Sequence, residues 1–95
     1  MTRREYLNAL EALLGSFDQW TYDRDRKRYT VTVDDITITV DAREASAQWM
    51  VEHANYGVIS NNWCDAPVIS HARRAAVEYT RAWVNVNIAD SVIPA

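Results

Sequence analysis

Cys64, His53, His71 and Asp65 are the residues of this chain whose types could carry covalent or metal chemistry. A thiol nucleophile needs a base and an orienting group beside it, and no family signature surrounds Cys64. The spacings His53-x10-Cys64 and Cys64-x6-His71 match no common structural zinc site. We therefore interpret Cys64 as a small buried or half-buried thiol, and we predict no catalytic site, no metal site and no bound cofactor.

Charged residues gather in two short runs that suggest chemistry of another kind. Asp34-Asp35 is a carboxylate pair, but general acid–base work requires a desolvated carboxyl, and a hairpin turn is wet. The run Asp23 to Arg28 contains four basic residues that could contact phosphates, although its two aspartates weaken their field. A turn and a solvated hairpin tip are therefore the favoured interpretations, and weak nucleic-acid binding through Arg24–Arg28 stays an alternative.

The middle of the chain is acidic, and the four Trp and five Tyr of the whole chain exceed what a core this small must use. Exposed aromatics rimmed by polar groups mark protein interfaces more often than catalytic sites, and opposite charges on two partners steer their association. We therefore predict that a protein partner binds to the residues Asp34, Asp35, Asp41, Glu44, Glu52, Tyr56, Asn61, Asn62 and Trp63.

The clearest structural pattern lies between Arg28 and Asp41. Apolar residues alternate with threonines on both sides of Asp34-Asp35, which predicts a hairpin of two half-buried strands. A turn at Asp34-Asp35 sets a register that puts six apolar side chains on one face, and a slip of one residue would turn them all to water. The predicted pairs are Val33 with Ile36, Val31 with Ile38, and Tyr29 with Val40.

A third strand is expected before this hairpin, over Gln19–Asp23. A tight turn at Asp25-Arg26 would place Tyr22 opposite Tyr29 and Trp20 opposite Val31, on the apolar face. Asp23, Arg28 and Asp41 would then line up across the polar face, beside a set of threonines. The sheet therefore needs helices on its apolar side only.

Three helices are expected around this meander. Thr2 and Glu5 have the spacing of a capping box, which predicts a helix over residues 2–14 that stops at Gly15. Asp41 and Glu44 repeat that spacing before a second expected helix, residues 42–54. The last helix should start after a cap at Asp65, accept Pro67 in its first turn and run to about Asn87.

For two segments the sequence allows two alternative structures. Residues 55–65 read as the longest irregular segment, either a connection anchored in the core by Val58, Ile59 and Trp63 or an exposed recognition loop. From residue 84 to 93 the chain is read as the helix end or as a short final strand, because Val84, Val86 and Ile88 alternate with asparagines. The stripe expected to pack the last helix consists of Val68, Ala72, Ala75, Tyr79, Trp83 and Val86.

The sequence thus predicts one α+β domain over residues 1–95, with two layers. A three-stranded antiparallel meander is covered on one face by helices, in the order α-β-β-β-α-α. The 95 residues carry a net charge of −3, which disfavours a dedicated nucleic-acid-binding domain. No long apolar stretch or signal peptide is recognised, and a single cysteine fits a reducing compartment, so we expect a cytoplasmic protein without membrane contact.

In size and composition the whole chain resembles the small orphan proteins of phages and mobile elements, among them the anti-CRISPR proteins. That resemblance implies a non-enzymatic protein that binds and blocks a host defence complex, with its carboxylates standing where nucleic acid would lie. A homodimeric structural protein, paired through the last helix or through a strand edge at Gln19–Asp23 or Ile36–Val40, is one alternative. A small enzyme using Cys64 is another.

Overall fold

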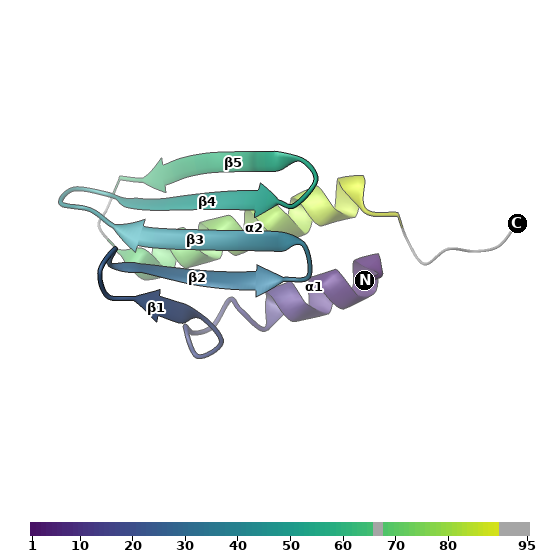
Figure 1. The fold of residues 1–95 in the computed structure, drawn as a ribbon, viewed down its shortest axis with the longest axis horizontal. Helices are drawn as coiled ribbons and strands as arrows, with labels where there is room; N and C mark the ends of the chain where they lie inside the picture. The colour runs from purple at the N-terminus through teal and green to yellow at the C-terminus, as the bar shows by residue number, and fades with distance from the viewer. Residues whose placement is uncertain (66–67, 90–95) are drawn as a thin grey trace, which may run out of the picture.

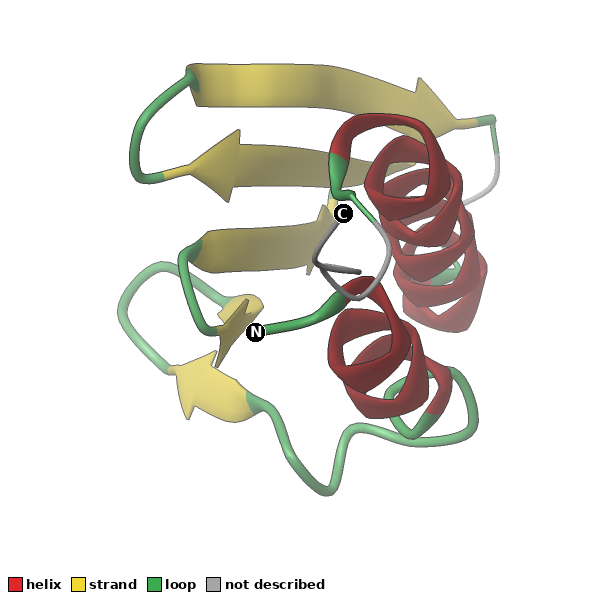
Figure 2. Ribbon diagram, turned by 90° about the vertical axis from the view of Figure 1, so that its right-hand side faces the viewer, coloured by secondary structure: helices red, strands yellow, loops and turns green. Residues whose placement is uncertain are grey.

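A computed structural model describes residues 1–65 and 68–89, and it shows two layers. Two helices lie on one face of an antiparallel sheet, and no element among the described residues covers the other face (Figures 1 and 2). The five strands follow one another across the sheet in chain order. The elements are α1 (Arg3–Glu11), β1 (Thr21–Asp23), β2 (Arg28–Val33), β3 (Ile36–Ala42), β4 (Ala47–His53), β5 (Gly57–Cys64) and α2 (Ile69–Asn87).

The predicted hairpin is present as β2 and β3, with the predicted register. Val33 pairs with Ile36, and the pairing continues without a slip to Arg28 and Asp41. Asp34 takes a positive φ of 54°, which is the backbone conformation that a tight turn requires. The third strand is also confirmed, although β1 is shorter than expected, and Tyr22 opposes Tyr29 as predicted.

The helix expected over residues 42–54 is wrong, because β4 occupies Ala47–His53. Burial alternates along this segment: Ala47, Trp49, Val51 and His53 are buried, and the residues between them are half-buried. Met50 hides that alternation in the sequence, because it adds an apolar residue between Trp49 and Val51. Asp41 is not a helix cap but a residue of β3, within 3.5 Å of Arg43.

The irregular segment expected over residues 55–65 is also wrong. After a short turn, the chain forms β5 and pairs antiparallel with β4. Gly57 has a φ of 73°, a left-handed conformation that favours glycine, and a register shift lies opposite Val51 and Glu52. The sheet therefore has five strands rather than three. Its edges are β1 and β5, so the predicted edge at Ile36–Val40 is instead the central strand β3.

Both described helices lie where the sequence predicts a helix, but their ends differ from the predicted ends. The capping box of Thr2 and Glu5 is present, and α1 ends at Glu11, three residues earlier than predicted. The last helix begins after Val68, so Asp65 does not cap it, and Pro67 lies outside the described residues. Its helical hydrogen bonding runs through Asn87 rather than changing to a strand, and residues 90–93 of that open segment also lie outside the described residues.

The face that α2 packs on the sheet is rotated from the predicted stripe. Ala72 is buried as expected, but Val68 and Val86 are exposed. The small side chains at Ala72, Ala76 and Thr80 lie one turn apart, and they let the helix approach the sheet closely. The resulting core consists mainly of residues from β3, β4, the two helices and the turn after α1, including Leu10, Leu13, Ile36, Ile38, Val40, Val51, Val77 and Val84. No helix among the described residues is long and apolar enough to cross a membrane.

Candidate functional site

The outer face of the sheet, here called the open face, is packed against neither helix and against no other described element (Figure 2). The strand registers arrange its side chains in three rows that cross the sheet. Row one is Asp23, Arg28, Asp41, Gln48 and Trp63. Row two is Thr21, Thr30, Thr39, Met50 and Asn61. Row three is Thr32, Thr37, Glu52 and Val58.

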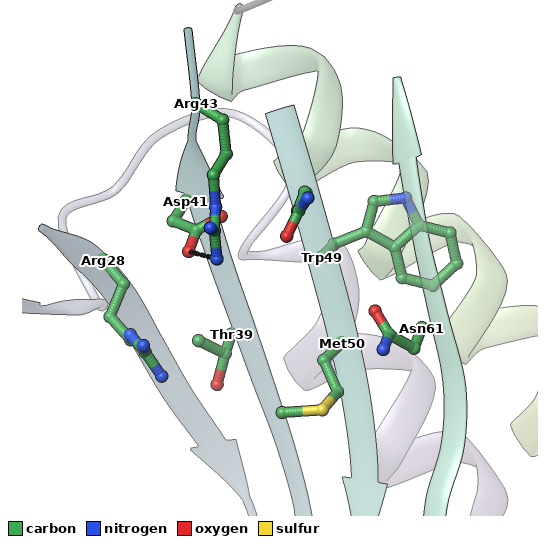
Figure 3. A pocket seen from close by; sticks show the side chains of 8 residues that line it. Arg28, Thr39, Asp41, Arg43, Trp49, Met50 and Asn61 are labelled. Carbon is green, nitrogen blue, oxygen red and sulfur yellow. Dashed lines mark ion pairs between the residues drawn. The ribbon is translucent and has the colours of Figure 1, made fainter. Parts of the chain in front are cut away.

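A hollow of about 190 Å³ lies between rows one and two. It is lined by residues of four strands and of the β3–β4 turn: Arg28, Thr39, Asp41, Arg43, Gln48, Trp49, Met50 and Asn61. Figure 3 shows the Met50 thioether reaching towards Thr39, and the Arg28 guanidinium turned along the sheet, away from the ion pair of Asp41 with Arg43. The hollow therefore combines two guanidinium groups, one carboxylate and two amides on a partly apolar floor.

Asp41 and Arg28 hold polar atoms that lack partners. The Asp41 side chain is only 14% exposed, and its Oδ2 lies 3.5 Å from Arg43 Nη2. Its other oxygen, Oδ1, is buried and accepts no hydrogen bond from any described residue. Arg28 Nε is likewise buried and has no acceptor among the described residues. Buried polar atoms are nearly always hydrogen-bonded in native proteins, so these two mark the hollow as a place for an external polar group.

Two large apolar side chains of β5 are exposed, and one of them, Trp63, lies beside this hollow. Trp63 is 61% exposed and opposes Gln48 in row one, while Val58 is exposed at the other end of the strand. The core-anchored interpretation of residues 55–65 is thus wrong for Trp63 and Val58, and only Ile59 of the three packs against the core. Tyr56 is exposed in the β4–β5 turn, Asn61 is on the open face, and Asn62 lies on the face of the helices, opposite Trp49.

The five predicted acidic contact residues do not form one row. Asp34, Asp35 and Glu52 lie together at the end of the sheet that holds the β2–β3 turn. Asp41 and Glu44 lie at the opposite end, roughly 20 Å away along β3 at about 3.3 Å per residue. Asp41 is also paired with Arg43, which reduces its field. These five carboxylates therefore do not form one continuous surface that could stand where nucleic acid would lie, as the resemblance implied.

At the acidic end, Asp35 lies between Tyr6 of α1 and His53 of β4, a cluster that the sequence did not reveal. The Tyr6 hydroxyl donates a hydrogen bond to Asp35 Oδ1, and it lies 3.2 Å from Asp34 Oδ2. His53 Nε2 lies 3.0 Å from Asp35 Oδ2, and His53 Nδ1 accepts the backbone N–H of Asn55 at 3.0 Å. Because Nδ1 is an acceptor, the imidazole proton sits on Nε2, facing the carboxylate.

The electrostatics of this cluster favour a neutral tyrosine and an ionised aspartate. Burial, together with the hydrogen bond to Asp35, raises the pKa of Tyr6 above its ordinary value. The same hydrogen bond lowers the pKa of Asp35. Both nitrogens of His53 are occupied, and its ring packs against Tyr56 and Trp83, so no nitrogen is free to take a proton from a substrate. We interpret the cluster as a structural tie between α1, the β2–β3 turn and β4.

Cys64 and His53 are not brought together. Cys64 pairs with Ala47 at one end of the β4–β5 hairpin, while His53 pairs with Gly57 at the other end. Among residues 1–65 and 68–89, no group of three or more His, Cys, Asp and Glu side chains could hold a metal ion. In the basic hairpin tip, the Asp23 carboxylate accepts the backbone N–H groups of Asp25 and Arg26, as expected of a solvated turn.

Sequence reasoning missed Gln48 and Met50 because it placed them on a helix. A strict strand reading of residues 47–53 would have put both beside Thr39 and Asp41, on the polar face already predicted for β2 and β3. Arg28 and Asp41 were correctly placed in one line, but their unpaired atoms follow from the side-chain packing. The chain matches no protein-family model, no curated protein and no solved structure.

Proposed function

We propose that this protein is a non-enzymatic protein-binding module, and that it binds its partner with the open face of the sheet. The observation that carries the proposal is the exposed Trp63, which stands beside a polar hollow on a face that no described element covers. Tryptophan is among the residues most enriched at the energetic centres of interfaces. Threonines, amides and charged groups around it provide the polar rim typical of such surfaces.

The class of partner follows from the resemblance in size and composition to phage-type inhibitors. Under this proposal, the partner is a host defence complex of the CRISPR-Cas kind. We place the contact surface on the open face rather than on the five predicted carboxylates alone, because those carboxylates lie at two ends of the sheet. The acids at the β2–β3 turn would flank that surface rather than form its centre.

Affinity capture from a nuclease-treated bacterial lysate tests this proposal. The tagged protein should retain one protein in stoichiometric amount. Trp63→Ala should reduce the amount retained, because the loss of an interface hot spot weakens the binding free energy by about 2 kcal/mol or more. Val86→Ala is the control, because Val86 is 82% exposed on α2, away from the open face. Equal retention by both variants would contradict binding through the open face. A partner lost on nuclease treatment would favour nucleic-acid binding through Arg24–Arg28 instead.

A second candidate function is self-association through the edge of β5. This strand has eight residues, longer than most, and none of them is charged or proline. Native edges are usually blunted by such residues, so two β5 strands could pair antiparallel about a two-fold axis. Light scattering at high concentration should then report a dimer, and Asn61→Lys should return it to a monomer. A wild-type monomer at millimolar concentration would remove this candidate.

A further inference from the structure

The hollow on the open face presents a donor and an acceptor that protein groups leave unused. Arg28 Nε is a buried donor, and Asp41 Oδ1 is a buried acceptor. The two residues are direct neighbours across the β2–β3 pair, yet no ion pair joins them among the described residues. A ligand that satisfies both atoms must therefore bring an acceptor for the arginine and a hydrogen-bond donor for the aspartate.

Arg28 sets the chemistry of the acceptor. A guanidinium group binds a carboxylate best through two parallel N–H groups, and the side-on mode uses Nε with one terminal nitrogen. Arg28 has no acidic partner among the described residues, whereas Arg43 is engaged by Asp41. A carboxylate entering the hollow would thus meet one unengaged guanidinium and gain a charge-assisted pair.

Asp41 sets the chemistry of the donor. Its free oxygen repels phosphate and sulfate, because these anions at neutral pH bring mainly acceptor oxygens next to a carboxylate. An acidic residue in a peptide carries both required groups, since its side chain ends in a carboxylate and its backbone has an N–H. Nearby, Trp63 and Met50 offer apolar surface for the residues on either side.

We propose that the hollow lined by Arg28, Asp41 and Asn61 is the anchor point for an acidic side chain of an extended segment in the partner protein. The carboxylate of that residue binds side-on to Arg28, and its backbone N–H donates to Asp41 Oδ1. This inference deepens the proposed function and rests on it, because it names the chemistry that the open face recognises. The chain is acidic overall, so the positive charge of Arg28 makes this one position selective for an acidic side chain of the partner.

The probe for this site is the capped tripeptide acetyl-Gly-Asp-Gly-amide, added to the full ¹⁵N-labelled chain and followed by NMR. The Arg28 Nε–H signal should shift with a saturating curve, together with the Asn61 and Gln48 side-chain amides. The capped Asn and Lys tripeptides are the comparison ligands. Equal shifts with the Asp and Asn tripeptides, or no shift with any of them, would overturn the proposal. A larger Arg28 shift with a short single-stranded oligonucleotide would overturn it in favour of nucleic acid.

Three variants identify the contact. Arg28→Gln should weaken binding of the Asp tripeptide at least tenfold, because one hydrogen-bonded charge pair is lost. Arg28→Lys keeps the charge without the fork and should also weaken binding, by about threefold or more. Arg26→Gln removes the same charge from the exposed β1–β2 turn, outside the hollow, and should leave binding within about twofold. Full binding by Arg28→Gln with an intact NMR spectrum would overturn the proposal.

These experiments distinguish a failure of the acidic-anchor inference from a failure of the proposed function. If the tripeptide does not bind but Trp63→Ala still abolishes capture of a protein partner, the open face binds protein and the acidic-anchor inference is wrong. If neither Trp63→Ala nor Arg28→Gln affects capture, the proposed function through this face is wrong as well.

Discussion

Tyr6 is the residue whose hydroxyl ties the first helix to the sheet. It is almost fully buried, and it donates to the Asp35 carboxylate while its ring belongs to the core. The tie joins segments that are 29 residues apart in the chain, so it forms only when the helix and the β2–β3 turn are both in place. A hydrogen bond to a charged group contributes about 1.5–3 kcal/mol to stability.

Replacement of Tyr6 by phenylalanine tests this tie. Tyr6→Phe keeps the ring in the core and should cost about 1.5 kcal/mol, because Asp35 is partly exposed and water can replace the lost donor. Urea unfolding measures the loss, and Tyr22→Phe, which changes an exposed tyrosine, is the control. Equal stability of the two variants would show that the Tyr6 hydroxyl does not stabilise the fold.

The alkaline limb of stability should depend on the same hydroxyl. The pKa of Tyr6 is raised by folding above its ordinary value of 10, so the folded chain holds this proton more tightly than the unfolded chain. Its contribution is therefore complete below pH 10 and is lost as the pH rises further. Unfolding free energies measured upward from pH 9 should fall less steeply in Tyr6→Phe than in the wild type. Parallel curves would contradict this.

The acid limb of stability should depend on Asp35. Its pKa is lowered in the folded chain by the hydrogen bond from Tyr6, so the unfolded chain binds this proton more tightly. The contribution is present above the unfolded pKa of about 3.9 and is lost as the pH falls through the lower folded value. Urea titrations between pH 6 and pH 2 should show a shallower decline for Asp35→Asn. A decline identical to that of Glu44→Gln, an exposed acid, would exclude Asp35 as the cause.

At the scale of elements, β4 is the strand that extends the sheet beyond β3, because β5 can join only by pairing with it. Its backbone pairs with β3 on one side and β5 on the other, and its alternate side chains enter the core or the open face. Asp41 and Glu44 have the spacing of a helix cap, so local signals favour a helix there. Burial of Trp49 and Val51 against α2 and β3 outweighs that local preference, because helix propensity is worth only tenths of a kcal/mol per residue.

Truncating two neighbouring residues of β4 should cost different amounts of stability. Val51→Ala removes buried methyl groups and should cost about 2 kcal/mol, whereas Met50→Ala, on the open face, should cost less than about 1 kcal/mol although more atoms are removed. Chemical denaturation of both variants gives the comparison. A larger cost at Met50 would contradict the strand assignment.

At the scale of the whole molecule, one face of a five-stranded sheet carries the core and the other carries the candidate site. The helices bury the apolar side chains, so the polar rows stay exposed by default. Stability is therefore expected to decrease from the centre of the sheet to its edges, because β3 pairs on both sides and β1 is short and peripheral. The open face, which is proposed to bind a partner, extends over both the centre of the sheet and its edges.

Hydrogen exchange checks this gradient. Amides of β3 should exchange at the rate of global unfolding, and those of β1 should exchange fastest among the strands. The outward-facing amides of β5 should be unprotected in a monomer, since they have no partner strand there. Protection of these amides that increases with protein concentration would instead support pairing between two β5 edges.

The sequence by itself determined the parts of the fold whose signals are local. The capping box at Thr2, the alternation over residues 28–41 and the line of Asp23, Arg28 and Asp41 all follow from spacing within one or two elements, and the structure has all three. It also indicated α+β architecture with helices on one face of the sheet, because only one face of the meander is apolar.

Only the tertiary structure decided what residues 42–65 form. Their alternation is broken by Met50 and by the register shift near Glu52, and a capping-box spacing precedes them, so local preference pointed to a helix and a loop. The edge of β3 lies only a short turn away, but the apolar surface of α2 is distant in the chain, and burying Val51 and Trp49 against α2 stabilises the strand that pairs there. β4 and β5 complete the open face and place Gln48, Met50 and Asn61 around the hollow that Arg28 also lines.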